Sequence, residues 1–268
     1  MMRLCVMVGV ALLSADSARA EDPIRLFNGK DLTNWYTFLA TPSGEAKPLG
    51  KNQDPRGVFR VHDGMIHVSG EVYGTITTEK EHENYRIVVE YKWGEKTWPP
   101  RVENARDSGL LVHCTGPDGA LSGAWMESIE ANIIEGGTGD ILAVDATKKT
   151  GLTAEVKEYA DGKRMYEPGG QAVVLDGQFG RIDRVGRDPA WKDVLGFRGA
   201  HEIEKPAGEW NTLEVECRGD TISVTLNGTL VNRVTRVKPA RGKIQLQSEG
   251  AEIFFRRVDL YPLGNDRG

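Results

Sequence analysis

Apolar and polar residues alternate with a period of two along most of the chain, and no window keeps a helical period of 3.6 for more than a turn or two. Segment 84–93 illustrates the pattern, because its large apolar residues take every second position: Tyr85, Ile87, Val89, Tyr91 and Trp93. Such alternation is typical of strands with one buried face and one polar face.

Turn dipeptides separate these strands at the spacing of hairpins. Segment 58–69 is divided by Asp63-Gly64, and segment 213–234 by Gly219-Asp220 and Asn227-Gly228. In segment 128–134 the apolar set predicts that Glu130 and Asn132 face away from the core, and in segment 243–248 Gln247 does the same. We therefore expect an all-β sandwich of two antiparallel sheets.

Two segments depart from the alternation. Residues 37–57 are rich in Pro, Gly and Lys and predict an irregular loop. Residues 136–206 carry a few strand patterns, such as LTAEVKEY at 152–159, among many turn signals, and predict a loop-rich insertion that walls a binding site. We expect one domain over residues 23–268 that contains this insertion.

The first twenty residues have the features of an export signal. Arg3 precedes a short apolar run, and small residues end at Ala20, so residues 1–20 are expected to be a signal peptide and the chain to be periplasmic or extracellular. The run is too short to span a membrane, and we expect no membrane insertion.

The net charge of -5 and the lack of a basic cluster argue against nucleic acid as a partner. Outside the signal, Cys114 and Cys217 could form a disulfide or remain buried thiols.

Glu130 and Glu135 in SIEANIIEGG, residues 128–137, are candidate paired carboxylates. The spacing nearly matches the E-x-D-x-x-E strand motif of retaining glucanases, in which one Glu attacks the sugar and the other donates a proton. An offset of five places the two side chains on opposite faces of a regular strand, so a bulge would be required. The other interpretation is that Glu135, directly before Gly136 and Gly137, ends the strand and is structural.

Five sequence blocks resemble one family of exported bacterial proteins. They are RLFNGKDLTNW (25–35), DSGLLVHC (107–114), SIEANIIEGG (128–137), GEWNTLEVECRGDTISVTLNGTLV (208–231) and GKIQLQSEGAEIFFRRVDLYPL (242–263). In this order they are similar to the blocks of the 3-keto-disaccharide hydrolase family, across nearly the whole chain. The resemblance implies a concanavalin A-like jelly roll with a concave face that binds sugar.

The resemblance also implies a chemistry. A ketone at C3 of a glucosyl unit acidifies the proton on C2, so a base can remove that proton, the group at C1 can leave, and water can then add. A sugar 3-dehydrogenase that makes the ketone would be a pathway partner. Glu130 and Gln247 match the family pattern, whereas Asp107, His113 and the Ser248-Glu249 pair stand where the family usually has other residues.

The candidate site residues follow from these patterns. Glu130 is the candidate base, and His113 and His201 are candidate acids or imidazole ligands. If a divalent metal ion takes part, Glu130 and His113 are the expected ligands, since carboxylates and imidazoles suit such ions. The candidate substrate-binding residues are Asn132, Gln247, Glu90, Lys92, Trp98, Arg101 and Trp125.

Three functions remain open on the sequence alone. The first is cleavage of 3-keto-glycosides, and the second is sugar binding without catalysis, in a lectin-like module with the same concave face. The third is conventional glucan hydrolysis by Glu130 and Glu135.

Overall fold

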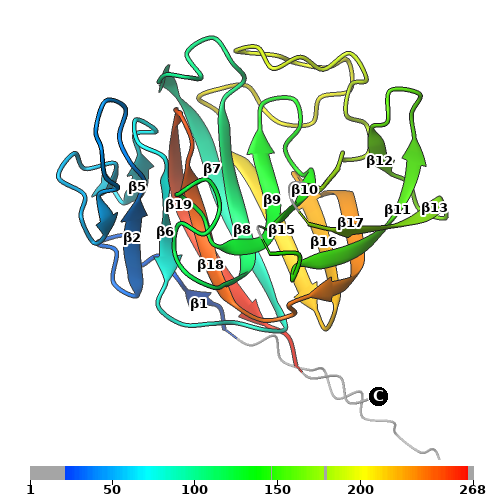
Figure 1. Ribbon diagram of the computed structural model, residues 1–268, viewed down its shortest axis with the longest axis horizontal. Helices are drawn as coiled ribbons and strands as arrows, with labels where there is room; N and C mark the ends of the chain where they lie inside the picture. Colours follow the sequence, from blue (N-terminus) through cyan, green and yellow to red (C-terminus); the bar gives the residue numbers. More distant parts are fainter. Residues whose placement is uncertain (1–21, 146, 178–179, 265–268) are drawn as a thin grey trace, which may run out of the picture.

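The computed structural model describes residues 22–145, 147–177 and 180–264, and within them the chain forms two large sheets (Figure 1). The expected signal peptide lies outside the described residues. Within the described residues, no helix has the length and apolar character needed to cross a membrane.

The first sheet has eleven strands. In spatial order they are β12 (Arg164–Tyr166), β11 (Gly151–Glu158), β17 (Thr229–Lys238), β16 (Thr221–Leu226), β15 (Asn211–Arg218), β7 (Tyr85–Thr97), β19 (Ala251–Pro262), β5 (Met65–Val68) and β4 (Phe59–His62), with β1 (Ile24–Arg25) beside β19 and β13 (Gln171–Asp176) beside β11.

The second sheet has eight strands and carries the candidate site. In spatial order they are β14 (Gly180–Ile182), β10 (Ile141–Val144), β9 (Glu127–Ile134), β8 (Asp107–Thr115), β18 (Lys243–Ser248), β6 (Gly74–Thr78), β2 (Trp35–Leu39) and β3 (Gly50–Lys51). The expected fold class, an all-β sandwich of two antiparallel sheets, is confirmed.

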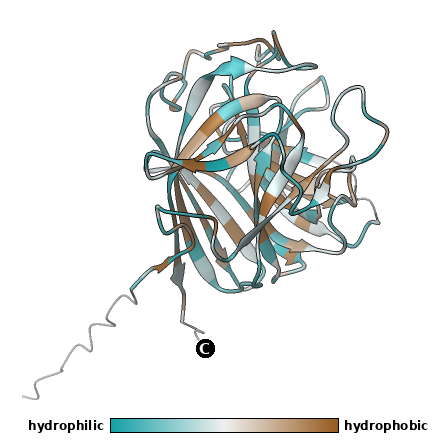
Figure 2. Ribbon diagram, turned by 90° about the vertical axis from the view of Figure 1, so that its left-hand side faces the viewer, coloured by the Kyte–Doolittle hydropathy of each residue, from teal (hydrophilic) through white to brown (hydrophobic). Residues whose placement is uncertain are grey.

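The main hydrophobic core consists of alternate residues from both sheets, as the period of two predicts (Figure 2). The inward set of β7 is the predicted one, and Ile129, Ala131 and Ile133 supply the inward face of β9. The predicted hairpins are also present, with β4 paired to β5 and with β15, β16 and β17 paired in sequence. Side-chain period therefore decides which residues point away from the core.

Both segments expected to be irregular contain strands. Residues 37–39 belong to β2 and 50–51 form β3, so the predicted loop over 37–57 is wrong at these positions. Segment 136–206 contributes β10 and β14 to one sheet and β11, β12 and β13 to the other. Its turn residues mark the connections, whereas pairing with strands distant in sequence determines the elements themselves.

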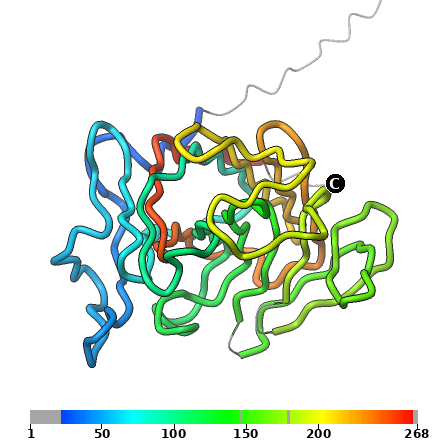
Figure 3. Tube along the Cα trace, turned by 90° about the horizontal axis from the view of Figure 1, so that it is seen from above, coloured from blue at the N-terminus to red at the C-terminus, as the bar shows by residue number. Residues whose placement is uncertain are grey.

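The irregular part of this segment, residues 184–206, runs along the top of the molecule in yellow (Figures 1 and 3) and is called the wall below. It is anchored to the eleven-stranded sheet through Glu204, whose Oε1 accepts hydrogen bonds from the Tyr91 hydroxyl at 2.7 Å and from Trp93 Nε1 at 2.9 Å. Burial raises the pKa of Glu204 to about 7. This anchor holds one end of the wall close to the sheet.

Candidate functional site

The outer face of the eight-stranded sheet, turned away from the core, is covered in part by residues 116–126. Leu121, Trp125 and Met126 from this connection pack on Leu111 of β8 and Leu142 of β10 to form a second buried cluster. Polar side chains continue the same face beside this cluster. Every residue of β9 is buried, including the polar ones that alternation turns outward.

Glu130 lies at the centre of this polar region. Its side chain is 4% exposed, and within the described part of the chain its carboxylate makes no hydrogen bond and no ion pair. The neighbouring strand makes room for it at Gly109: a Cβ atom there would lie 2.4 Å from Glu130 Oε1 and 2.4 Å from Gln247 Oε1. Two side chains from β9 and β18 therefore converge over a glycine of β8, and Gln247 Oε1 has no hydrogen-bond partner either.

Two further carboxyl groups, Asp107 and Glu249, belong to the same electrostatic cluster as Glu130. Burial raises the pKa of Glu130, and the negative charge of Asp107 adds to the shift. Burial also raises the pKa of Glu249, with contributions from Asp107 and Glu130, and it raises the pKa of Asp107 itself. Arg101 and Arg181 oppose these shifts at Asp107 and Glu249, and Arg181 does so at Glu130. The arrangement is an acidic cluster in which burial and neighbouring negative charges favour the protonated forms of Glu130 and Glu249, and two guanidinium groups border it.

Arg101 links this acidic cluster to the wall. Its Nη2 lies 3.3 Å from Asp107 Oδ2 and 3.0 Å from Asp193 Oδ1. Asp193 also accepts hydrogen bonds from Asn104 Nδ2 at 2.8 Å and from the backbone N–H of Ala105 at 3.1 Å. One carboxylate of the wall thus fixes the position of the loop that carries Arg101.

The remaining residues expected on this face have distinct surroundings. Asn132 is buried with its Oδ1 unpartnered. Trp125 packs in the second buried cluster, and its Nε1 is buried without a partner. Trp98 is half-buried, and its Nε1 donates to the carbonyl of Ser69 at 2.9 Å. Its backbone N–H donates to the carbonyl of Gly250, which brings the Trp98 loop beside the turn that follows Glu249.

His113 does not lie on the predicted hydrophilic face. A β-bulge between Val112 and Thr115 inserts an extra residue into β8, and His113 takes a φ of 54°. Its ring turns to the core, where it contacts Tyr85 of the other sheet edge-on at 6.0 Å. Neither ring nitrogen makes a hydrogen bond. Burial lowers the pKa of His113 to about 4, and the backbone of Pro239 opposes this shift. The expectation failed because the bulge reverses the alternation.

His201 is not brought to Glu130 either. It is an exposed residue of the wall, near Asp188. Hydrogen bonds from two backbone N–H groups lower the pKa of Asp188, and His201 contributes to the same shift.

Glu90 and Lys92 lie on the eleven-stranded sheet, in β7, and not on the sheet that carries Glu130. Glu90 is ion-paired with Arg256 at 2.5 Å and with Arg257 at 3.3 Å. The Lys92 ammonium sits over the ring of Trp210 at 5.1 Å. Strand alternation predicts the face of a residue correctly here, but it does not indicate which of the two sheets a strand joins.

Glu135 has a structural environment. Its carboxylate pairs with Arg106 at 2.6 Å and accepts the backbone N–H of Gly196 at 2.9 Å, while its carbonyl accepts Trp191 Nε1 at 2.8 Å. These bonds tie the wall to the end of β9. They occupy the carboxylate that a glucanase mechanism would need as the partner of Glu130.

The two expected metal ligands, Glu130 and His113, point to opposite faces of β8 and β9. In the described ranges there is no group of three or more His, Cys, Asp or Glu residues that could hold a metal ion. Glu130 and His113 therefore do not converge on one metal ion in this structure. Cys114 and Cys217 are both buried and free, so the structure contains no disulfide between them.

Three site residues were not among the sequence candidates: Asp107, Glu249 and Arg181. Asp107 and Glu249 stand at departures from the family pattern, and alternation from Gly109 and Gln247 would have placed both on the outer face. Arg181 carried no signal, because β14 was not among the strand patterns recognised in segment 136–206.

A comparison with protein-family models identifies the family of this chain. Residues 22–260 match the model of the 3-keto-alpha-glucoside-1,2-lyase-like domain, and the chain belongs to that family. The family resemblance seen in the sequence is thereby confirmed. A comparison with curated proteins found no match.

Solved structures with similar chains include a proposed glycosyl hydrolase from Parabacteroides distasonis, with 20% identity, a TM-score of 0.48 and coverage of 89% of this chain and 93% of that one. They also include a β-glucanase from Bacillus licheniformis, with 11% identity, a TM-score of 0.46 and coverage of 92% and 100%. A carbohydrate-binding module from Bacillus subtilis shows 12% identity, a TM-score of 0.43 and coverage of 85% and 95%.

Proposed function

We propose that this protein cleaves the glycosidic bond of 3-keto-glucosides and that Glu130 is the base. The observation that carries the proposal is the Glu130 carboxyl itself, which is buried, free of hydrogen bonds and centred in an acidic cluster. Membership of the 3-keto-alpha-glucoside-1,2-lyase-like family supplies the substrate class.

The raised pKa of Glu130 suits the first step. A carboxylate whose conjugate acid has a pKa near the working pH is a stronger base than an exposed one, and it still exists in part as the carboxylate. It takes the C2 proton, and the electron pair left on carbon delocalises onto the C3 ketone oxygen as an enolate. Arg101 and Arg181, which border the acidic cluster, are the groups able to stabilise that negative charge.

The second step needs an acid at the leaving oxygen. The enolate expels the group at C1, which takes a proton, and water then adds across the double bond to give net hydrolysis. Glu249 is the better candidate acid than His113, because burial and the charges of Asp107 and Glu130 raise its pKa well above the ordinary value, which favours the protonated form, and because it belongs to the same cluster. His113 faces the core.

The proposal has consequences outside the chain. The substrate requires prior oxidation at C3, so an oxidoreductase of the sugar 3-dehydrogenase type would act before this protein. The signal-like sequence at 1–20 supports a periplasmic or extracellular location. A divalent ion remains a proposal, and inhibition by EDTA that added metal reverses would support it.

Glu130→Gln separates catalysis from simple sugar binding. We expect this variant to bind a 3-keto-glucoside but to lose turnover by about 100-fold or more, the usual contribution of a general base. Glu90→Gln is the matched control, because Glu90 is a carboxylate on the other sheet, and it should keep its turnover. Binding with no turnover in the unmodified protein would instead indicate a lectin-like module.

A further inference from the structure

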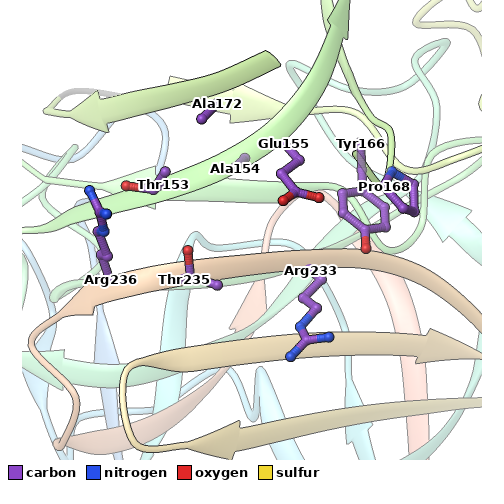
Figure 4. Close-up of a pocket in the computed structure, with 9 residues that line it drawn as sticks. All are labelled: Thr153, Ala154, Glu155, Tyr166, Pro168, Ala172, Arg233, Thr235 and Arg236. Carbon is purple, nitrogen blue, oxygen red and sulfur yellow. The ribbon is translucent and has the colours of Figure 1, made fainter. Parts of the chain in front are cut away.

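A cavity lies on the eleven-stranded sheet, at the edge formed by β11, β12 and β17. Its volume is about 520 Å³, which is within the range of small-molecule sites in proteins. Figure 4 shows its lining, with Glu155 and Tyr166 on one side and Arg233 and Arg236 along the other. Glu130 belongs to the other sheet, so this cavity is separate from the proposed catalytic site.

Two features of strand pairing create the cavity. One edge of β11 pairs with β17 at its start and with β12 at its end, so the two partners diverge beside Glu155. The pairing of β11 with β17 also shifts register after Gly151, and Arg236 takes a φ of 53°. Val234 and Val237 remain in the core, so the extra residue leaves both Thr235 and Arg236 on the outer side.

The charge of the cavity is not balanced by the protein. In the described part of the chain, the guanidinium groups of Arg233 and Arg236 make no ion pair and no hydrogen bond. The one acidic lining residue, Glu155, uses its Oε2 to accept the backbone N–H of Gly169 at 2.8 Å. Two guanidinium groups therefore face the cavity against one carboxylate that already has a partner.

Tyr166 gives the cavity an aromatic wall. The residue is 7% exposed and packs against the core, and burial raises the pKa of its hydroxyl, which the charge of Arg233 opposes. In Figure 4 the hydroxyl end of Tyr166 is directed toward β17, the strand that carries Arg233, and the Arg233 side chain extends from that strand away from the ring. Thr153 and Thr235 supply hydroxyl groups at the Arg236 end.

We propose that this cavity is a second, non-catalytic site that binds an acidic saccharide, meaning a sugar that carries a carboxylate or a sulfate ester. Guanidinium groups bind these planar or tetrahedral anions with two parallel hydrogen bonds. A tyrosine ring offers an apolar face with a polar tip, and threonine hydroxyls can both donate to and accept from sugar hydroxyls. The choice of a sugar among anions rests on the proposed function.

Titration of the full-length protein with glucuronate, glucose 6-sulfate, glucose and inorganic sulfate, followed by calorimetry, tests this site. We expect glucuronate or glucose 6-sulfate to bind, and glucose to bind at least about tenfold more weakly. Added salt should weaken the binding of the acidic sugars. Arg233→Gln and Arg236→Gln should each weaken acidic-sugar binding by about tenfold. Arg60→Gln, at an exposed arginine of β4 on the opposite edge of the same sheet, is the matched control and should change nothing.

Other outcomes would overturn the proposal. Equal affinity for glucose and glucuronate, or an equal loss in Arg60→Gln, would mean that the two cavity arginines do not select the ligand. Binding of inorganic sulfate as tight as that of both acidic sugars would mean a general anion site. Glu130→Gln should leave acidic-sugar binding unchanged, so failure at this cavity is distinguishable from failure of the proposed catalysis.

Discussion

The buried carboxyl of Glu130 should lower the stability of the folded protein at neutral pH. Its pKa is raised from 4.5 to about 8, so between these values the folded protein holds a proton that the unfolded chain has lost. Each pH unit in that window lowers the free energy of unfolding by about 1.4 kcal/mol. From pH 4.5 to 7 the upper limit is about 3.4 kcal/mol, and we expect about half of this because Asp107 and Glu249 titrate together with Glu130.

Glu130→Gln removes this titration. At pH 7 we expect the free energy of unfolding of the variant to exceed that of the unmodified protein by about 1.5–3 kcal/mol, and near pH 4.5 we expect the two to agree. Urea unfolding followed by tryptophan fluorescence at pH 4.5, 6, 7 and 8 measures the difference. A difference that stays constant over this range would refute the raised pKa, and with it the argument that Glu130 is a tuned base.

Three further substitutions test other parts of the account. Glu135→Gln should lower the free energy of unfolding by about 3 kcal/mol, because it leaves a buried guanidinium without its partner; unchanged urea unfolding would contradict the structural role of this carboxylate. Gly109→Ala should abolish turnover of a 3-keto-glucoside while the protein still folds, because a Cβ atom would occupy the space of the Glu130 and Gln247 side chains. Gly151→Ala is the control and should stay active, because its Cβ atom would meet only an ordinary contact at 3.5 Å. His113 has a folded pKa of about 4, so stability should be lost as pH falls from about 6.5 to 4, where only the unfolded chain takes up the proton. His113→Asn, which tolerates the positive φ, should flatten the unfolding profile in that window, and an unchanged profile would show that the imidazole is not held neutral.

Much of the fold could be predicted because side-chain period and turn residues are local properties of the sequence. The inward residues of β7 and β9 and the hairpin turns were correct for this reason. His113 was wrong because a bulge depends on pairing with β9, and Glu90 was misplaced because sheet membership depends on contacts distant in sequence. Local pattern contains neither kind of information.

The candidate site was predictable at its centre and not at its border. Glu130 and Gln247 carried both the alternation and the family pattern, and they meet over Gly109. Asp193 could not be found from sequence, since its role follows from three hydrogen-bonding groups that the fold brings to it from residues 101–105. Burial of the polar residues of β9 was also unexpected, because alternation indicates the face on which a residue lies but not what covers that face.

Product formation from a 3-keto-glucoside and from its unoxidised parent, with the unmodified protein and with Glu130→Gln, tests the central claim most directly. Mass spectrometry or NMR would follow the released sugar. The account predicts cleavage of the keto sugar alone, and its loss in Glu130→Gln. Cleavage of the unoxidised parent at a similar rate, or full activity in the variant, would contradict proton abstraction at C2 by Glu130.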